Sequence, residues 1–108
     1  MAFERVLAMS IDAKKIVLHS ESGYSEKYEP VLSEIIRSRA LLFCVVGKDC
    51  ELWHDIMDEM LVGDGSLHLG FEMITTWHND ESLEEVIEFA RIFYVDTPDP
   101  EAVQIIVV

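Results

Sequence analysis

The sequence predicts an α/β fold: a three-layer sandwich with a mostly parallel sheet of four or five strands, of the flavodoxin-like or Rossmann-like kind. Short β-branched segments alternate along the chain with longer segments whose apolar residues recur at helical spacing. Strands that alternate with amphipathic helices form parallel sheets with helices on both faces. A length of 108 residues is that of one domain, so residues 1–108 are expected to form a single α/β domain.

The first half of the chain predicts two strands and the helix between them. Residues 14–19, KKIVLH, are short and β-branched, which indicates a buried strand near the centre of the sheet. Residues 28–36 carry apolar side chains at helical spacing, and Pro30 fits the first turn of that helix. The apolar run ALLFCVVG at residues 40–47 is typical of a strand covered on both faces.

The second half predicts two further helices and two further strands. Asp49 is expected to cap the first of these helices. A strand is expected over residues 69–76, a helix from about residue 80 to 94, and a last strand over residues 102–108. Ser82 and Glu85 have the spacing of a capping box. The inward stripe of the helix after Asp49 is expected to consist of Leu52, Trp53, Ile56, Met57, Met60 and Leu61.

Residues 1–13 allow two interpretations, because FERVLAM at residues 3–9 fits either a short helix or an edge strand. This start has no basic flank and no long apolar run, so we expect neither a secretory signal nor a membrane anchor. The chain is therefore expected in the cytoplasm, where Cys44 and Cys50 would remain thiols.

Polar segments follow three of the predicted strands, and we expect them to meet at one edge of the sheet. In open parallel sheets, ligands bind beyond the carboxyl ends of the strands, near the point where strand order reverses. The segments are residues 19–22, 47–50 and 75–81. The predicted polar-edge binding residues are Asp49, Thr75, Thr76, Trp77, His78, Asp80 and Glu81.

Cys50, His54 and His78 are the candidates for catalysis. Cys50 lies at the predicted start of a helix, which favours a thiolate, and His54 lies one turn further along the same side. Burial as a structural thiol is the alternative interpretation. The same three residues, together with Asp80, are ligand types that suit zinc, although no HExxH or CxxC spacing is present.

No cofactor is expected. The phosphate-binding patterns GxxxxGK[ST] and GxGxxG do not occur in the sequence. The GxSxG pattern of a nucleophile elbow does not occur either.

The charge is strongly asymmetric. The chain carries a net charge of −13, with 21 acidic and 8 basic residues. Residues 49–108 hold 15 of the acids and a single basic residue, Arg91. Nucleic acids and anionic membranes are therefore unfavourable partners, whereas a basic protein is a favourable one. A solvated acidic surface without a partner is the alternative. The apolar last strand, if it lies at a sheet edge, predicts a homodimer.

The stretches VVGKDCELWHDIMDE and ITTWHNDESLEEVIEFA resemble a family of small uncharacterised bacterial α/β domains with the motifs GxDC…HD and TTWHxDExLEE. The resemblance covers most of residues 14–95. It implies a fold and a shared polar edge, but no reaction. The matching residues are Gly47, Asp49, Cys50, Asp55, Thr75, Thr76, Trp77, His78, Asp80, Glu81 and Leu83.

Two function classes remain from the sequence. The first is a non-enzymatic protein-interaction or regulatory module that presents an acidic helix, with Glu81, Glu84, Glu85 and Glu88, to a basic protein. The alternative is a small metal-binding or cysteine/histidine-dependent enzyme with its site at the carboxyl ends of the strands. A short chain without large loop insertions offers little material for an enclosed pocket, which favours the first class.

Overall fold

A computed structural model describes residues 10–63 and 72–108, which contain an all-parallel, four-stranded sheet. The strand order is β3-β2-β1-β4, the order of the first four strands of a Rossmann sheet. The predicted parallel α/β sandwich is therefore confirmed, with the first strand in an inner position. The strands are β1 (Lys15–Ser20), β2 (Leu42–Gly47), β3 (Ile74–His78) and β4 (Gln104–Val107).

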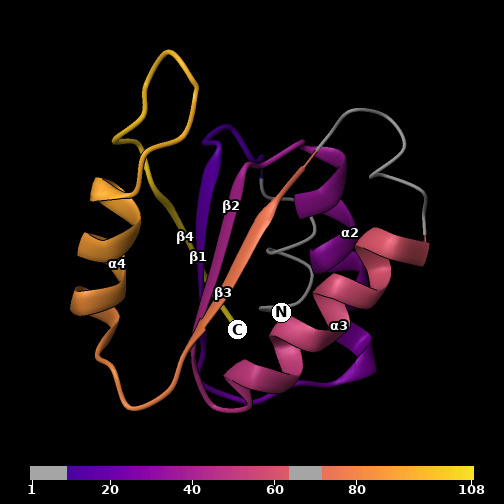
Figure 1. Ribbon diagram of the computed structural model, residues 1–108. Helices are drawn as coiled ribbons and strands as arrows, with labels where there is room; N and C mark the ends of the chain where they lie inside the picture. The colour runs from indigo at the N-terminus through magenta and orange to yellow at the C-terminus, as the bar shows by residue number, and fades with distance from the viewer. Residues whose placement is uncertain (1–9, 64–71) are drawn as a thin grey trace.

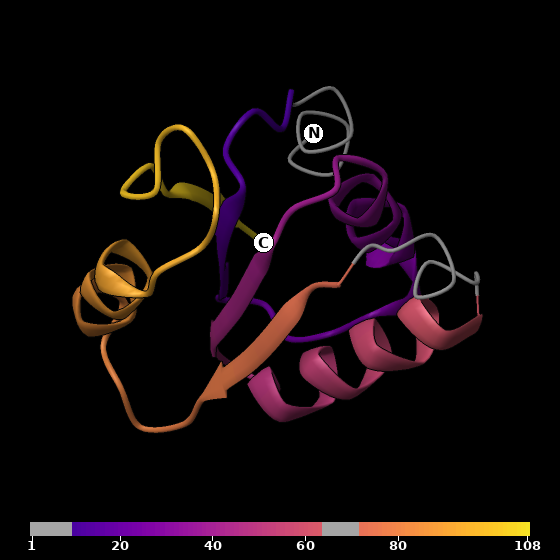
Figure 2. The same ribbon diagram turned by 45° about the horizontal axis from the view of Figure 1, so that its top comes forward.

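Helices cover both faces of this sheet (Figures 1 and 2). One face carries α2 (Glu29–Arg37), which follows the 3-10 turn η1 (Glu26–Tyr28), and α3 (Cys50–Gly63). The other face carries α4 (Leu83–Ile92), at the left of Figure 1. The α4 helix, which connects β3 to β4, thus lies on the opposite face of the sheet from α2 and α3, which connect the first three strands.

Two apolar clusters lie on either side of the sheet, because successive residues of a strand point to opposite faces. Ile16 and Leu18 of β1 belong to the cluster under α2 and α3. Val17 of β1 belongs to the cluster under α4, together with Cys44 and Val46 of β2. The inner strands are buried on both faces, as the continuous apolar runs predict.

The α3 helix packs on the sheet through Trp53, Met57 and Leu61, which are buried and four residues apart. Ile56 is partly buried against the same cluster. Leu52, which was expected in this stripe, is 46% exposed, so that prediction is wrong. Leu52, Ile56 and Met60 each precede a buried residue and so lie on the same flank of the helix, where Ile56 and Met60 are partly covered and Leu52, in the first turn, is not.

The α4 helix is fixed at both ends by polar contacts. The predicted capping box is confirmed: the Glu85 N–H donates to Ser82 Oγ at 3.1 Å, and the Ser82 N–H donates to Glu85 Oε1 at 2.9 Å. At the other end, the buried Lys15 Nζ donates to the carbonyls of Ala90 at 2.7 Å and Arg91 at 3.1 Å. A cation at a helix C-terminus is favourable for the helix dipole.

Parts of the sequence-based prediction fall outside the described residues. The segment FERVLAM does so, as does the beginning of the strand expected over residues 69–76; β3 itself begins at Ile74. Across residues 10–63 and 72–108, no helix is long and apolar enough to cross a membrane.

Candidate functional site at the carboxyl ends of the strands

The parallel register places the three predicted polar segments on one rim of the sheet. Ser20 at the end of β1 pairs with Gly47 of β2, and Val46 of β2 pairs with His78 at the end of β3. Along this rim, the polar side chains form three separate groups with different partners.

The first group connects the ends of β1 and β2 through backbone contacts. Gly47 has a φ of 103°, and a Cβ at this position would lie 2.3 Å from the Ser20 carbonyl oxygen. The same oxygen accepts a hydrogen bond from the Lys48 N–H at 2.8 Å. Ser20 Oγ accepts from Trp53 Nε1 at 2.9 Å and from the Gly23 N–H at 3.2 Å. These contacts need a glycine at position 47, because only glycine tolerates both the φ and the close approach.

Asp49 takes part in the same connection. Its carbonyl accepts the first hydrogen bond of α3, from the Trp53 N–H at 2.9 Å, as expected of an N-cap residue. Its backbone, however, has a φ of 61°, and its carboxylate accepts from the Tyr24 N–H at 3.0 Å. The side chain therefore fixes the loop after β1. Cys50 follows and is only 4% exposed, within the core cluster. In this structure the GxDC motif holds two loops together.

The point where strand order reverses lies between β1 and β4, and backbone contacts occupy it. The N–H groups of Glu21 and Ser22 both donate to the Val108 carbonyl, at 2.7 Å and 3.2 Å. The β3 strand, which carries the TTWH segment, is at the other edge of the sheet. The TTWH segment is thus away from the position where cofactors bind in folds of this order.

The second group lies on the α3 side of β3. Thr75 Oγ1 donates to Asp58 Oδ1 at 2.7 Å. His54 on α3 has Nδ1 3.0 Å from Asp55 Oδ1 and Nε2 3.5 Å from Asp58 Oδ2. The His54 ring also meets the Trp77 ring edge-on, with centroids 6.5 Å apart.

The third group lies on the α4 side of β3, because alternate residues of a strand face opposite ways. The Thr76 hydroxyl is 2.8 Å from His78 Nε2, and His78 Nδ1 is 3.2 Å from Glu81 Oε1. The His78 ring packs against Phe89 of α4 at 4.9 Å and is buried. Hydroxyl, imidazole and carboxylate follow one another in the order of a hydrolase triad.

The catalytic and metal-ligand candidates do not converge in the described part of the chain. The two histidines contact separate carboxylates on opposite sides of β3, and no hydrogen bond joins either of them to Cys50. Asp80 lies in an exposed turn with a φ of 65°. Within residues 10–63 and 72–108, no three His, Cys, Asp or Glu side chains are grouped so that they could hold a metal ion. The other cysteine, Cys44, is fully buried, and burial raises its pKa to about 11.

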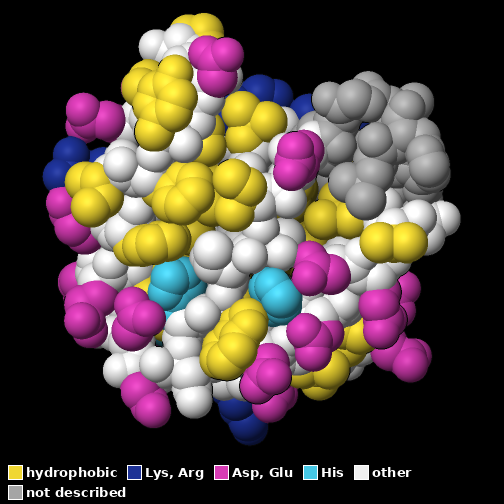
Figure 3. Space-filling view, viewed as in Figure 1, with side chains coloured by type: hydrophobic (Ala, Val, Ile, Leu, Met, Phe, Trp, Pro, Cys, Tyr) yellow, Lys and Arg dark blue, Asp and Glu magenta, His cyan; other side chains and the backbone are white. Residues whose placement is uncertain are grey.

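The molecular face around β3 is acidic on both flanks, and histidine side chains are visible between them (Figure 3). On the α4 flank, a shallow surface is lined by four glutamates and two apolar side chains. We call it the α4 surface, and its residues are Glu81, Glu84, Glu85, Glu88, Phe89 and Ile92. The glutamates were predicted from the sequence, whereas Phe89 and Ile92 were not. The signal was present, since these two residues are three apart and so share a helix side with Glu85 and Glu88.

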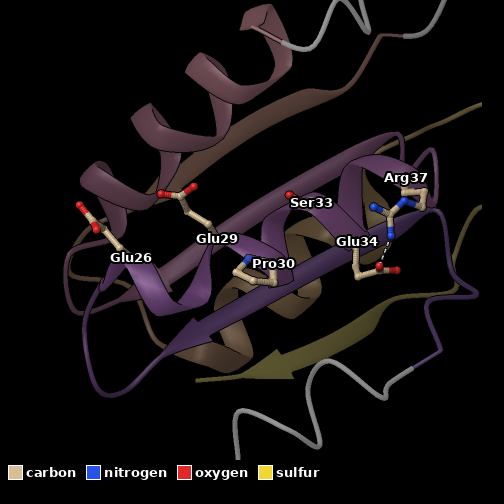
Figure 4. A pocket seen from close by; sticks show the side chains of 6 residues that line it. All are labelled: Glu26, Glu29, Pro30, Ser33, Glu34 and Arg37. Atoms are coloured by element: carbon tan, nitrogen blue, oxygen red, sulfur yellow. Dashed lines mark hydrogen bonds and ion pairs between the residues drawn. The ribbon is translucent and has the colours of Figure 1, made fainter.

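A second hollow runs along the outer side of α2 and contains none of the predicted site residues (Figure 4). Arg37 and Glu34 form an ion pair at one end, while Glu26 and Glu29 lie toward the other. The complete lining is Glu26, Glu29, Pro30, Ser33, Glu34 and Arg37.

Together, these features define a small α/β domain in which backbone contacts connect the inner strands at their carboxyl ends and an acidic surface adjoins one edge strand. The sequence model of the family described as Domain of unknown function (DUF7684) matches residues 5–108, and the chain belongs to that family. The resemblance to an uncharacterised family of small domains is thereby confirmed. Comparison with curated proteins and with solved structures gave no match.

Proposed function

We propose that this protein is a non-enzymatic interaction module that binds a basic protein through the α4 surface. The observation that carries the proposal is the composition of that surface, in which four glutamates line the same shallow surface as the half-buried Phe89 and the 66% exposed Ile92. Apolar contacts surrounded by charged groups are the usual anatomy of a protein–protein interface. The carboxylates would select a basic partner and accelerate its approach.

Arg91, the basic residue at the end of α4, neutralises only the nearby part of this surface. Arg91 at the end of α4 is held by Glu88, with Nη2 to Oε2 at 2.5 Å, and by Glu101, with Nη1 to Oε1 at 3.0 Å. Glu84 is exposed, and the α4 N-terminus beside it has no basic residue in its first turn. The negative charge is therefore concentrated toward the start of the helix, and we expect the basic groups of the partner there.

Two features make the enzyme alternative less well supported than the interaction module. Cys50 is buried in the core and has no histidine partner among the described residues. The Thr76–His78–Glu81 arrangement has triad order, but Thr76 lies within a strand, where successive backbone N–H groups point in opposite directions. A strand offers no pair of converging N–H donors, which acyl transfer needs for its oxyanion.

A basic peptide tests the proposal directly. A labelled oligolysine of about ten residues should bind in low salt and be released as ionic strength screens the carboxylates. Glu84→Lys should weaken this binding roughly threefold to tenfold, since it reverses a charge within the α4 surface.

Glu29→Lys is the matched control, because Glu29 is also an exposed glutamate in the first turn of its helix, α2. It makes the same change in net charge at a surface remote from α4. If Glu29→Lys weakened peptide binding as much as Glu84→Lys, binding would reflect net charge alone, and the proposed surface would be wrong.

A further inference from the structure

We infer that the edge of β3 that faces away from β2 accepts an extended, basic segment of the partner as a fifth strand, beside the α4 surface. This inference rests on the proposed function for the charge of the partner. It adds the mode of binding, which is the addition of a strand to a sheet edge.

The backbone of β3 leaves hydrogen-bonding groups at that edge. The Ile74 N–H points toward β2, since it donates to the Leu41 carbonyl at 3.0 Å. In a parallel pair, the N–H and C=O of one residue point to the same side and those of the next residue to the other. The N–H and C=O groups of Thr75 and Trp77 therefore point away from β2. No strand pairs with this side of β3 in the described part of the chain.

The side chains at the edge favour an added strand that carries an apolar residue on each of its faces. Ile74 is 41% exposed and Trp77 is 40% exposed, and they lie on opposite faces of the sheet. An apolar residue of an added strand would cover each of them. An uncovered edge with exposed apolar residues is the kind of edge that pairs with another chain.

The charge at this edge selects the occupant. Glu81 and Glu84 lie on the α4 flank, and Asp55 and Asp58 lie on the α3 flank (Figure 3). A strand between these flanks would have carboxylates near both of its faces, which suits lysine or arginine side chains. A second copy of this chain would bring acidic flanks together, and like charges placed face to face are costly.

The other edge strand, β4, is contacted at its beginning and lies at the opposite edge of the sheet from β3 and the acidic flanks described there. The side chain of Gln104 accepts from the Asp12 N–H at 3.1 Å and donates to the Ser10 carbonyl at 2.8 Å. Residues 10–13 therefore lie against the beginning of β4. The N–H of Val108 donates to the His19 carbonyl on β1, so by alternation the Ile105 N–H points to the outer edge.

The test uses two peptides with the same side chains and charge. One repeats two lysines followed by two valines over about seven residues, the length of an ordinary strand, so that each face of the strand carries both residue types. The other is methylated on every backbone nitrogen and cannot form a ladder. We expect the unmethylated peptide to bind at least about tenfold more tightly, which corresponds to the loss of two or three hydrogen bonds. It should also slow hydrogen exchange at the Thr75 and Trp77 amides.

A pair of proline variants locates the binding edge. Proline is tolerated in edge strands but blocks strand addition. Thr75→Pro should abolish the preference for the unmethylated peptide, whereas Ile105→Pro, the matched change on β4, should keep it. The peptide comparison on the unchanged protein remains decisive if Thr75→Pro fails to fold.

The outcomes separate this inference from the proposed function. Equal binding of both peptides, with release by salt, would overturn strand addition and leave the basic partner in place. Binding of neither peptide in low salt would overturn both proposals. A dimer in light scattering that Thr75→Pro converts to a monomer would show that the edge pairs with a second copy, which also overturns the inference.

Discussion

Replacing Gly47 by alanine should be among the most damaging single-methyl changes in this protein. A non-glycine residue with a φ of 103° is strained, at a cost of about 1–3 kcal/mol. The added Cβ would also lie 2.3 Å from the Ser20 carbonyl oxygen, a backbone atom that the fold holds in place. Relief of that overlap would break the Lys48–Ser20 hydrogen bond, which is worth about 1 kcal/mol. We therefore expect a loss of about 3 kcal/mol in the free energy of unfolding.

Urea unfolding measures this loss. With a slope of about 1–3 kcal/mol per molar urea for a chain of this size, the midpoint should fall by roughly 1–3 M. Gly63→Ala is the matched control, because no atom of residues 10–63 or 72–108 lies within 4 Å of a Cβ at Gly63, which is in α3. That change should leave the midpoint unchanged or raise it by the equivalent of up to about 1 kcal/mol. If Gly47→Ala were as stable as the unchanged protein, the rigid connection between β1 and β2 would be refuted.

Three further predictions follow from groups that the fold buries or caps. Burial lowers the pKa of Lys15 below 10.5, so its charged form is disfavoured in the folded state. Stability should therefore rise as pH rises from the folded pKa toward 10.5, and the urea midpoint of Lys15→Met should lack this rise. A Lys15→Met midpoint that rises with pH as steeply as that of the unchanged protein would contradict the assignment. Hydrogen bonds with Ser82, the largest effect coming from its backbone N–H, lower the pKa of Glu85, so the stabilisation that depends on the Glu85 charge is present above 4.5 and lost as pH falls through the folded pKa. Glu85→Ala should therefore lower the melting temperature more at neutral pH than in acid, and an equal drop at both pH values would count against this reading. Burial should keep Cys44 and Cys50 unreactive toward a disulfide reagent at mildly alkaline pH until urea is added, and rapid modification of one thiol in the native protein would be the opposite result.

The fold follows closely from the sequence because its signals are local and repeated. The apolar runs around Val17 and Val45 are continuous, as inner strands require, and α4 begins at a capping box that can be read from Ser82 and Glu85. The inner position of the first strand was also predicted, whereas right-handed crossovers leave both a flavodoxin-like and a Rossmann-like strand order possible. The local pattern does not predict which partner each polar side chain contacts in the folded protein.

Asp49 and Lys15 illustrate that limit. Asp49 has the residue type of a helix cap, but its carboxylate bonds to Tyr24, a partner 25 positions away in the chain. Lys15 lies in the strand predicted over residues 14–19. Its ammonium group donates to the carbonyl of Ala90, near the end of α4 and 75 positions further along the chain. Contacts between distant segments of the chain have no signature in residue spacing.

The TTWH segment was partly predictable. Its position in the third strand follows from the sequence pattern. Strand alternation also divides its side chains between the two faces of the sheet: Thr75 and Trp77 lie on one face, and Thr76 and His78 lie on the other. From the sequence, these residues were predicted to form one polar group. The structure gives them separate partners on α3 and α4.

The two tryptophans of this chain sit in contrasting surroundings. Trp53 is fully enclosed, with its indole N–H bonded to Ser20 and its ring against Tyr24 and Tyr28, whereas Trp77 is partly open to water at the β3 edge. A shielded indole emits at shorter wavelengths than a hydrated one, and a soluble quencher reaches only the latter. A single fluorescence emission spectrum therefore carries two separable signals. The Trp53 signal reports unfolding of the core, and the Trp77 signal reports a change of solvent exposure at the β3 edge.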